Sequence, residues 1–144
     1  MTSSCRGLTV VAVFSVASHL AAQCTSQWDQ QPGFQVQGQV YAMQEWDPDG
    51  PGPLPAQLVL GGSLTGAGGV AAQNVVCYEP QTGVFSPLSV GVDGPVRAFA
   101  VLPGNVLAVG GAFATAGGIP ANGIATWNRT SWQALGSGVT GGGV

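Results

Sequence analysis

The sequence contains no lysine, only three arginines and one histidine, and just 6% of its 144 residues are charged. Nucleic-acid-binding proteins neutralise phosphates with clustered Lys and Arg side chains, so we expect no nucleic-acid partner. The single histidine, His19, lies in an N-terminal apolar run. A chain that loses this run cannot form a Ser-His-Asp or Cys-His catalytic site, or a zinc or copper site that needs histidine. The composition therefore predicts a protein that is not an enzyme.

Residues 1–23 have the layout of a secretory signal peptide: a short basic start, an apolar run, and small residues before Gln23. A membrane anchor is the alternative, but spanning a bilayer takes roughly 20 apolar residues, and this run is shorter. A lipid attached to Cys24 is a further alternative. Such sites carry a small residue just before the cysteine, whereas this sequence has Gln23 at that position. We expect cleavage near Gln23, no later membrane span, and a secreted, cell-surface or periplasmic protein.

One stretch occurs twice in the chain. Leu58–Tyr78 matches Leu107–Trp127 without a gap, and Gly61 and Gly110 are 49 residues apart (110 − 61). A fixed period near 50 residues is typical of repeat architectures. The shared motif comprises Gly61, Gly62, Gly68, Gly69 and Tyr78 in the first copy, and Gly110, Gly111, Gly117, Gly118, Trp127 and Trp132 in the second.

Each repeat reads as four short strands separated by Gly, Pro and Asn turns. In the second repeat the expected strands are Val96–Leu102, Val106–Phe113, Ile124–Trp127 and Trp132–Leu135. The fold class is therefore all-β, with four-stranded antiparallel blades of an incomplete β-propeller of about two blades. A small sandwich or an open β-solenoid is the alternative.

A single twisted sheet cannot cover both of its faces, so each blade needs a neighbour. Aromatic side chains are expected to fill the gaps between blades: Trp127, Trp132, Tyr78, Phe85, Phe99 and Phe113. Glycine inside a strand, as at Gly110 and Gly111, predicts that another backbone or a ring packs against that spot.

The chain divides into a signal peptide (1–23), an N-terminal strand segment (24–37), a first blade (38–93) and a second blade (94–144) that ends where a third repeat would begin. The first blade carries an insertion at 46–53. Cys24 and Cys77 could form a disulfide in an oxidising compartment. Alternatively Cys77 is a small buried residue, because Thr126 occupies its place in the second repeat.

The pattern Gly-Gly-x-Phe-x-x-Ala-Gly-Gly, followed by Ala-x-Trp, Trp and Leu-Gly-x-Gly, resembles the Gly-rich, kelch-like propeller repeats of large secreted bacterial proteins. It is also similar to the extracellular repeats of the fungal cortical polarity-marker family. The resemblance covers about residues 28–144. It implies a propeller and further blades, supplied by the same protein or by other copies, and it implies no particular activity.

The insertion contains the densest acidic cluster, with Asp47 and Asp49 spaced two apart before Gly50. This spacing is similar to the start of a calcium loop, but the later ligands are missing. We favour a surface turn capped by Asp side chains and expect no cofactor, with calcium as the weaker alternative. Carboxylates for glycosidic cleavage are scattered over residues that look like turns.

The sequence thus predicts a secreted or cell-surface propeller segment that acts as a non-catalytic structural or binding module for a protein or carbohydrate. Two alternatives stay open at this point. One is the N-terminal part of a propeller enzyme whose active site lies in other blades, and the other is a calcium-dependent adhesion module.

Overall fold

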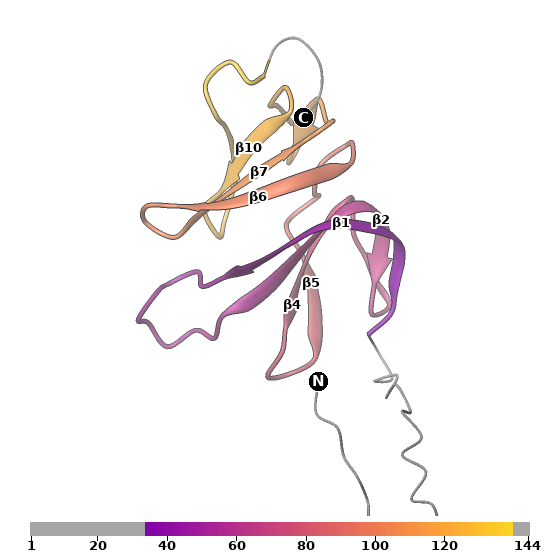
Figure 1. Cartoon of the computed structure of the whole chain (residues 1–144), viewed down its shortest axis with the longest axis vertical. Coiled ribbons are helices and arrows are strands. Elements are labelled where there is room, and N and C mark those ends of the chain that lie inside the picture. Colours follow the sequence, from indigo (N-terminus) through magenta and orange to yellow (C-terminus); the bar gives the residue numbers. More distant parts are fainter. Residues whose placement is uncertain (1–33, 140–144) are drawn as a thin grey trace, which may run out of the picture. The chain divides into compact units, whose positions relative to one another are not determined.

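The computed structural model describes residues 34–139, which consist of strands and turns and contain no helix. The first sheet has the order β1-β2-β4-β5, with β3 paired to β2, and the second has the order β6-β7-β10-β11 (Figure 1). The strands of the first sheet are β1 (Val36–Trp46), β2 (Gln57–Ala67), β3 (Val70–Ala71), β4 (Val75–Glu79) and β5 (Val84–Pro87). Those of the second are β6 (Val96–Leu102), β7 (Val106–Gly111), β10 (Ile124–Trp127) and β11 (Trp132–Ala134). A separate hairpin joins β8 (Thr115–Ala116) to β9 (Ile119–Pro120). The all-β prediction is confirmed, and all pairs are antiparallel.

The two repeats have the same register. In the first sheet Ala42 pairs with Gly61, and in the second Ala98 pairs with Gly110. The pairing is interrupted at the same place in both, just before these alanines. Such a β-bulge bends a strand and increases its twist. Each sheet is therefore bent at the same point, opposite its first Gly-Gly pair.

Backbone hydrogen bonds outside the ladders also repeat. Gly62 N donates to Asn74 O at 3.0 Å, and Gly111 N donates to Gly123 O at 2.9 Å. Gly68 N donates to Gln35 O, and the matching amide of Gly117 donates to Gly91 O, both at 2.8 Å. The two copies thus fold alike in their irregular parts as well as in their strands.

The glycines of the motif have two different tasks. The second pair forms tight hairpin turns, in which Gly117 and Gly118 have φ values of 59° and 82°. Two successive residues with positive φ fit a type I′ turn, whose twist matches the twist of the paired strands. Glycine adopts a positive φ without a steric penalty. The first pair allows close approach: a Cβ at Gly62 would lie 1.9 Å from Gln39 O, and one at Gly111 would lie 2.2 Å from Pro95 O. The prediction that a backbone or a ring packs against Gly110 and Gly111 is confirmed at Gly111. It is wrong at Gly110, where a Cβ would have no neighbour closer than 3.9 Å.

A shared core joins the two sheets. The first sheet contributes Val59, Val75 and Cys77, and the second contributes Leu107, Val109, Ala125 and other apolar residues. The segment between the sheets adds Leu88 and Val92, which are also buried. Each fully buried Val or Leu side chain contributes about 1.5–3 kcal/mol relative to exposure. The sheets are therefore held together mainly by apolar burial, with β6 lying beside β1 (Figure 1).

A second cluster lies on the opposite face of the first sheet. It contains Leu60, Leu64, Val76 and Phe85, with Tyr78 packed against them. Phe34 completes an aromatic group, its ring centroid 5.0 Å from Tyr78 and 5.3 Å from Phe85. The sequence predicted that Tyr78 and Phe85 would lie in a gap between blades. They do not lie between these two sheets but on the other face of the first sheet. Trp127, Trp132, Phe113 and Phe99 do lie between the two sheets.

Several sequence predictions concern residues outside the described part: the signal peptide at 1–23, Cys24, most of the segment at 24–37, and the last residues of the second repeat. Within residues 34–139 neither sheet closes into a ring. The same residues include no helix long and apolar enough to cross a membrane.

Candidate binding cleft between the two sheets

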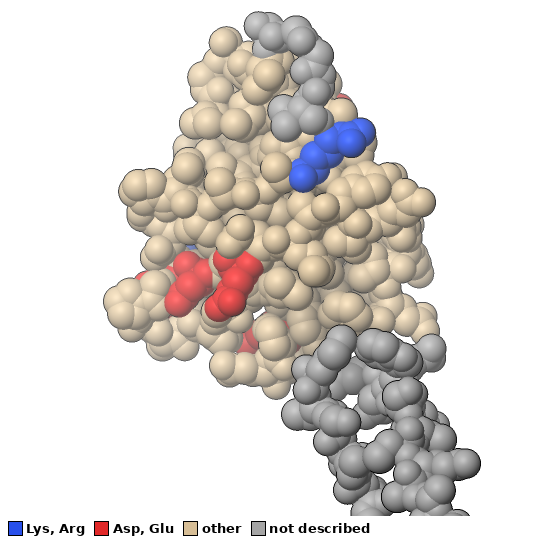
Figure 2. All heavy atoms as spheres, viewed as in Figure 1, with Lys and Arg blue, Asp and Glu red and all other residues tan. Residues whose placement is uncertain are grey.

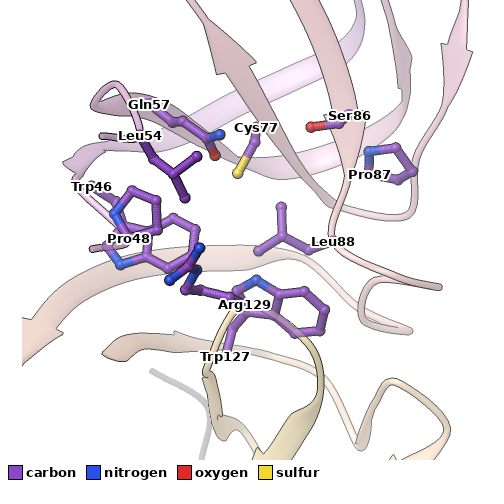
Figure 3. Close-up of a pocket in the computed structure, with 10 residues that line it drawn as sticks. All are labelled: Trp46, Pro48, Leu54, Gln57, Cys77, Ser86, Pro87, Leu88, Trp127 and Arg129. Atoms are coloured by element: carbon purple, nitrogen blue, oxygen red, sulfur yellow. The ribbon is translucent and has the colours of Figure 1, made fainter. Parts of the chain in front are cut away.

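A cavity of about 220 Å³ opens between the sheets, where the insertion of the first repeat approaches the β10–β11 turn of the second. Its walls are formed by Trp46, Pro48, Leu54, Gln57, Cys77, Ser86, Pro87, Leu88, Trp127 and Arg129. Trp46, Pro48 and Leu54 lie together on one side of the cavity, and the Arg129 side chain extends from beside Trp127 toward Trp46 (Figure 3). We call this cavity the inter-sheet cleft.

Trp46 anchors the insertion to the second sheet. It is the last residue of β1 and is only 2% exposed. Its indole Nε1 donates a hydrogen bond to the carbonyl oxygen of Asn105, in the β6–β7 turn, at 2.8 Å. This bond gives the buried indole N–H a partner, so it holds Trp46 in the wall of the cleft and links the two sheets.

The acidic residues of the insertion are engaged in turn hydrogen bonds. Asp47 Oδ1 accepts from Gly50 N at 2.8 Å and from Asp49 N at 3.2 Å. Asp49 Oδ2 accepts from Leu54 N at 3.1 Å, while its buried Oδ1 has no hydrogen-bond partner among the described residues. These contacts are those of Asx turns. Within residues 34–139 no group of three or more His, Cys, Asp or Glu side chains could hold a metal ion. A calcium site at Asp47 and Asp49 stays a prediction.

The polar turn between β10 and β11 carries Arg129, the only arginine among the residues that line the cleft. Asn128 Oδ1 accepts from Ser131 N at 2.9 Å and from Thr130 N at 3.1 Å. In this turn the backbone of Arg129 has a φ of 85°, a value that residues other than glycine rarely adopt. Arg129 is exposed and lies at the mouth of the cleft.

Trp127 lines the cleft and packs against Trp132. The rings of Trp127 and Trp132 lie with centroids 5.3 Å apart at 49°. Trp132 Nε1 donates to Leu88 O at 2.9 Å, which ties β11 to the segment between the sheets. Trp127, which lines the cleft, and Trp132, which packs against it, are both buried, so neither indole offers a flat exposed face.

Cys77 is the one thiol among the described residues, and it has no disulfide partner there. Its side chain lies in the core and its sulfur points toward the cleft (Figure 3). Burial raises the pKa of this thiol to about 12. The thiolate is the nucleophilic form, so Cys77 is inert at neutral pH. Its pairing with Cys24 stays a prediction, because Cys24 lies outside the described residues.

The cleft thus combines apolar side chains, the polar side chains of Gln57 and Ser86, one cationic side chain and a neutral thiol. Sequence reasoning singled out the insertion, Trp127 and Cys77, but it did not assign Arg129, Leu54 or Leu88 to a site. Nothing local marks these residues, since only the packing of the two sheets brings them together. The face in Figure 2 is largely uncharged, with acidic side chains gathered on one side and a basic side chain on the other.

No protein-family model matches the chain, and neither a curated protein nor a solved structure shows significant similarity to it.

Proposed function

We propose that the chain is a non-catalytic structural and binding segment of a secreted or cell-surface β-propeller repeat protein. The repeated four-stranded sheets, with the same bulge and the same Gly-Gly turns, support the propeller architecture. The expected leader at 1–23 supports export. The inter-sheet cleft supports binding, because its wall is built by an insertion that only one repeat has.

Of the two expected ligand classes, a protein segment fits the cleft better than a carbohydrate. Sugars bind to exposed aromatic faces, whereas Trp46, Trp127 and Trp132 are all buried. The cavity of about 220 Å³ is also smaller than the roughly 300–1,000 Å³ of typical ligand pockets. It has room for one apolar side chain. The Arg129 guanidinium at its mouth would pair with a neighbouring carboxylate.

The single observation that carries this proposal is therefore a small cavity, with both apolar and polar walls, that has one guanidinium at its rim. A test is to titrate the chain with the dipeptide N-acetyl-Phe-Asp, with its N-acetyl-Phe-Asn analogue, and with neutral and acidic oligosaccharides. The indole N–H signals of Trp46 and Trp127 are followed by NMR. We expect the acidic dipeptide to shift both signals and Arg129→Gln to weaken its binding about tenfold, which corresponds to about 1.4 kcal/mol.

Arg97→Gln is the matched control. Arg97 is exposed, and its guanidinium lies 5.8 Å from the ring centroid of Tyr41, away from the cleft lining. Binding that Arg97→Gln weakens as much as Arg129→Gln would contradict the proposed site. Shifts caused only by oligosaccharides would replace the protein ligand with a carbohydrate, and no shift from any probe would remove the binding function.

A further inference from the structure

The contact between the two sheets has a socket and an insert. The socket is Gly61 in β2: a Cβ there would lie 2.5 Å from both Phe99 Cζ and Val96 Cγ1. The insert is therefore the pair Val96 and Phe99 of β6, which packs on bare backbone. No side chain larger than hydrogen fits at Gly61 without displacing this pair.

The second sheet has an equivalent socket on its far face. Gly110 pairs with Ala98 as Gly61 pairs with Ala42, so the two glycines occupy the same place in their sheets. The nearest atoms to a Cβ at Gly110 are Ala98 O and Gly123 O, at 3.9 and 4.0 Å. Both are backbone atoms, one of β6 and one of the turn just before β10. Gly110 is thus open where Gly61 is covered.

Gly110 faces away from the first sheet, because its neighbour Val109 lies in the shared core. The residues paired with Gly110 across the sheet are Ala98 and Ile124, and Ala100, Ala108 and Thr126 lie on the same face; all of these side chains are uncharged. A shallow, uncharged surface of this kind suits an inserted apolar side chain. Ala98 and Ala100 on this face are exposed.

The first sheet carries an equivalent insert on its own far face. Met43 pairs with Leu60 as Phe99 pairs with Val109, and Val40 pairs with Gly62 as Val96 pairs with Gly111. Leu60 belongs to the cluster turned away from the second sheet, so Met43 and Val40 point away as well. Met43 is 63% exposed and Val40 is 39% exposed, whereas Val96 is fully buried.

We propose that two copies of this chain associate head to tail, with Met43 and Val40 of one copy packed on Gly110 of the next. The occupant is a second copy because the chain itself presents both halves of a contact that it already makes internally. Methionine is flexible and fits a shallow apolar surface well. A contact between two different faces is heterologous, so it propagates into a ring or an open array. This inference goes beyond the proposed binding function, since it concerns the outer sheet faces and not the cleft.

Two substitutions each remove one half of the contact. Gly110→Leu fills the socket, and because Gly110 has no positive φ and no close neighbour, the sheet tolerates the side chain. Met43→Asp places a charge on the insert. Val90→Asp is the matched control, because Val90 is 59% exposed in the segment between the sheets. Circular dichroism and the melting temperature confirm that each variant is folded.

Sedimentation velocity of the full chain over a wide concentration series tests the proposal. We expect concentration-dependent association that Gly110→Leu and Met43→Asp each weaken at least about tenfold and that Val90→Asp leaves unchanged. A mixture of the two variants retains one intact pair of faces, so it should form one-to-one dimers and nothing larger. A wild-type chain that stays monomeric, an association that neither variant weakens, or a mixture that does not dimerise would each overturn the proposal.

Discussion

The indole of Trp46 and the carbonyl of Asn105 are joined by a 2.8 Å hydrogen bond that spans 59 residues of sequence. It links the end of β1 in the first sheet to the β6–β7 turn of the second. Removing this hydrogen bond should therefore change the free energy of unfolding, which can be measured.

Trp46→Phe should lower the free energy of unfolding by about 1–3 kcal/mol, because the substitution removes a hydrogen bond and shortens a side chain that is only 2% exposed. Urea denaturation followed by circular dichroism measures the change. Asn105→Gly is the control: it keeps both the carbonyl and the positive φ of 59° at that position. If the control destabilised the chain as much as Trp46→Phe, the loss could not be assigned to the hydrogen bond.

Gly61→Ala and Gly110→Ala should differ in stability although the two positions are equivalent in sequence. At Gly61 the new methyl group meets Phe99 and Val96 at 2.5 Å, which should cost about 1–3 kcal/mol as overpacking. At Gly110 no atom lies closer than 3.9 Å, so the change should stay within about 0.5 kcal/mol. Thermal melts of both variants at one low concentration provide the comparison. Equal losses would show that Phe99 does not pack on Gly61.

Cys77 should make the chain less stable at alkaline pH. Its folded-state pKa of about 12 lies above the ordinary value of 9.0, so only the unfolded chain releases the thiol proton between these values. The stabilisation is complete below pH 9 and is lost as pH rises toward 12, with a slope of about 1.4 kcal/mol per pH unit. Urea midpoints between pH 8 and pH 11 should fall more steeply for the native sequence than for Cys77→Ala. Parallel slopes for the two proteins would mean that the thiol is not buried in solution.

Asp93 should contribute in the opposite pH range. Hydrogen bonds from the backbone N–H groups of Thr115 and Ala114 to Asp93 Oδ1, at 2.9 and 2.8 Å, hold the pKa of this carboxyl below its usual range. A lowered pKa stabilises the fold above the unfolded-state value, and that contribution disappears as pH falls through the folded value. Asp93→Asn should therefore flatten the acid limb of the stability profile while changing the alkaline limb little. A steeper acid limb in the variant would contradict this role.

Strand positions could be predicted from sequence where apolar runs end at Pro, Gly or Asn. The expected strands Val96–Leu102 and Ile124–Trp127 coincide with β6 and β10. In the first repeat β1 begins at Val36 and passes through Gly38 at a φ of 115°, so this strand is longer than its counterpart β6. The β8–β9 hairpin was missed because its strands are only two residues long and read as part of a Gly-rich turn.

The cleft could be predicted only in part. The insertion was visible as a gap in the repeat alignment, and it does form one wall. The opposite wall depends on which face each sheet turns toward its neighbour. Tyr78 and Trp127 are equivalent in sequence, yet Trp127 faces the other sheet and Tyr78 faces away. In a stack every sheet has one face toward the preceding unit and one toward the next, so equivalent residues meet different surroundings in the first and last members.

The β1–β2 connection comprises residues 47–56, while the matching β6–β7 connection comprises only 103–105. The paired glycines and alanines stay in register despite this difference. Hairpin ends of this scaffold therefore tolerate changes in loop length without shifting the strands beneath them. A foreign peptide inserted between Pro103 and Gly104 leaves the Asn105 carbonyl in place for Trp46. It should be displayed next to the insertion of the first repeat on an unaltered sheet, which makes this turn a natural place for engineering new recognition.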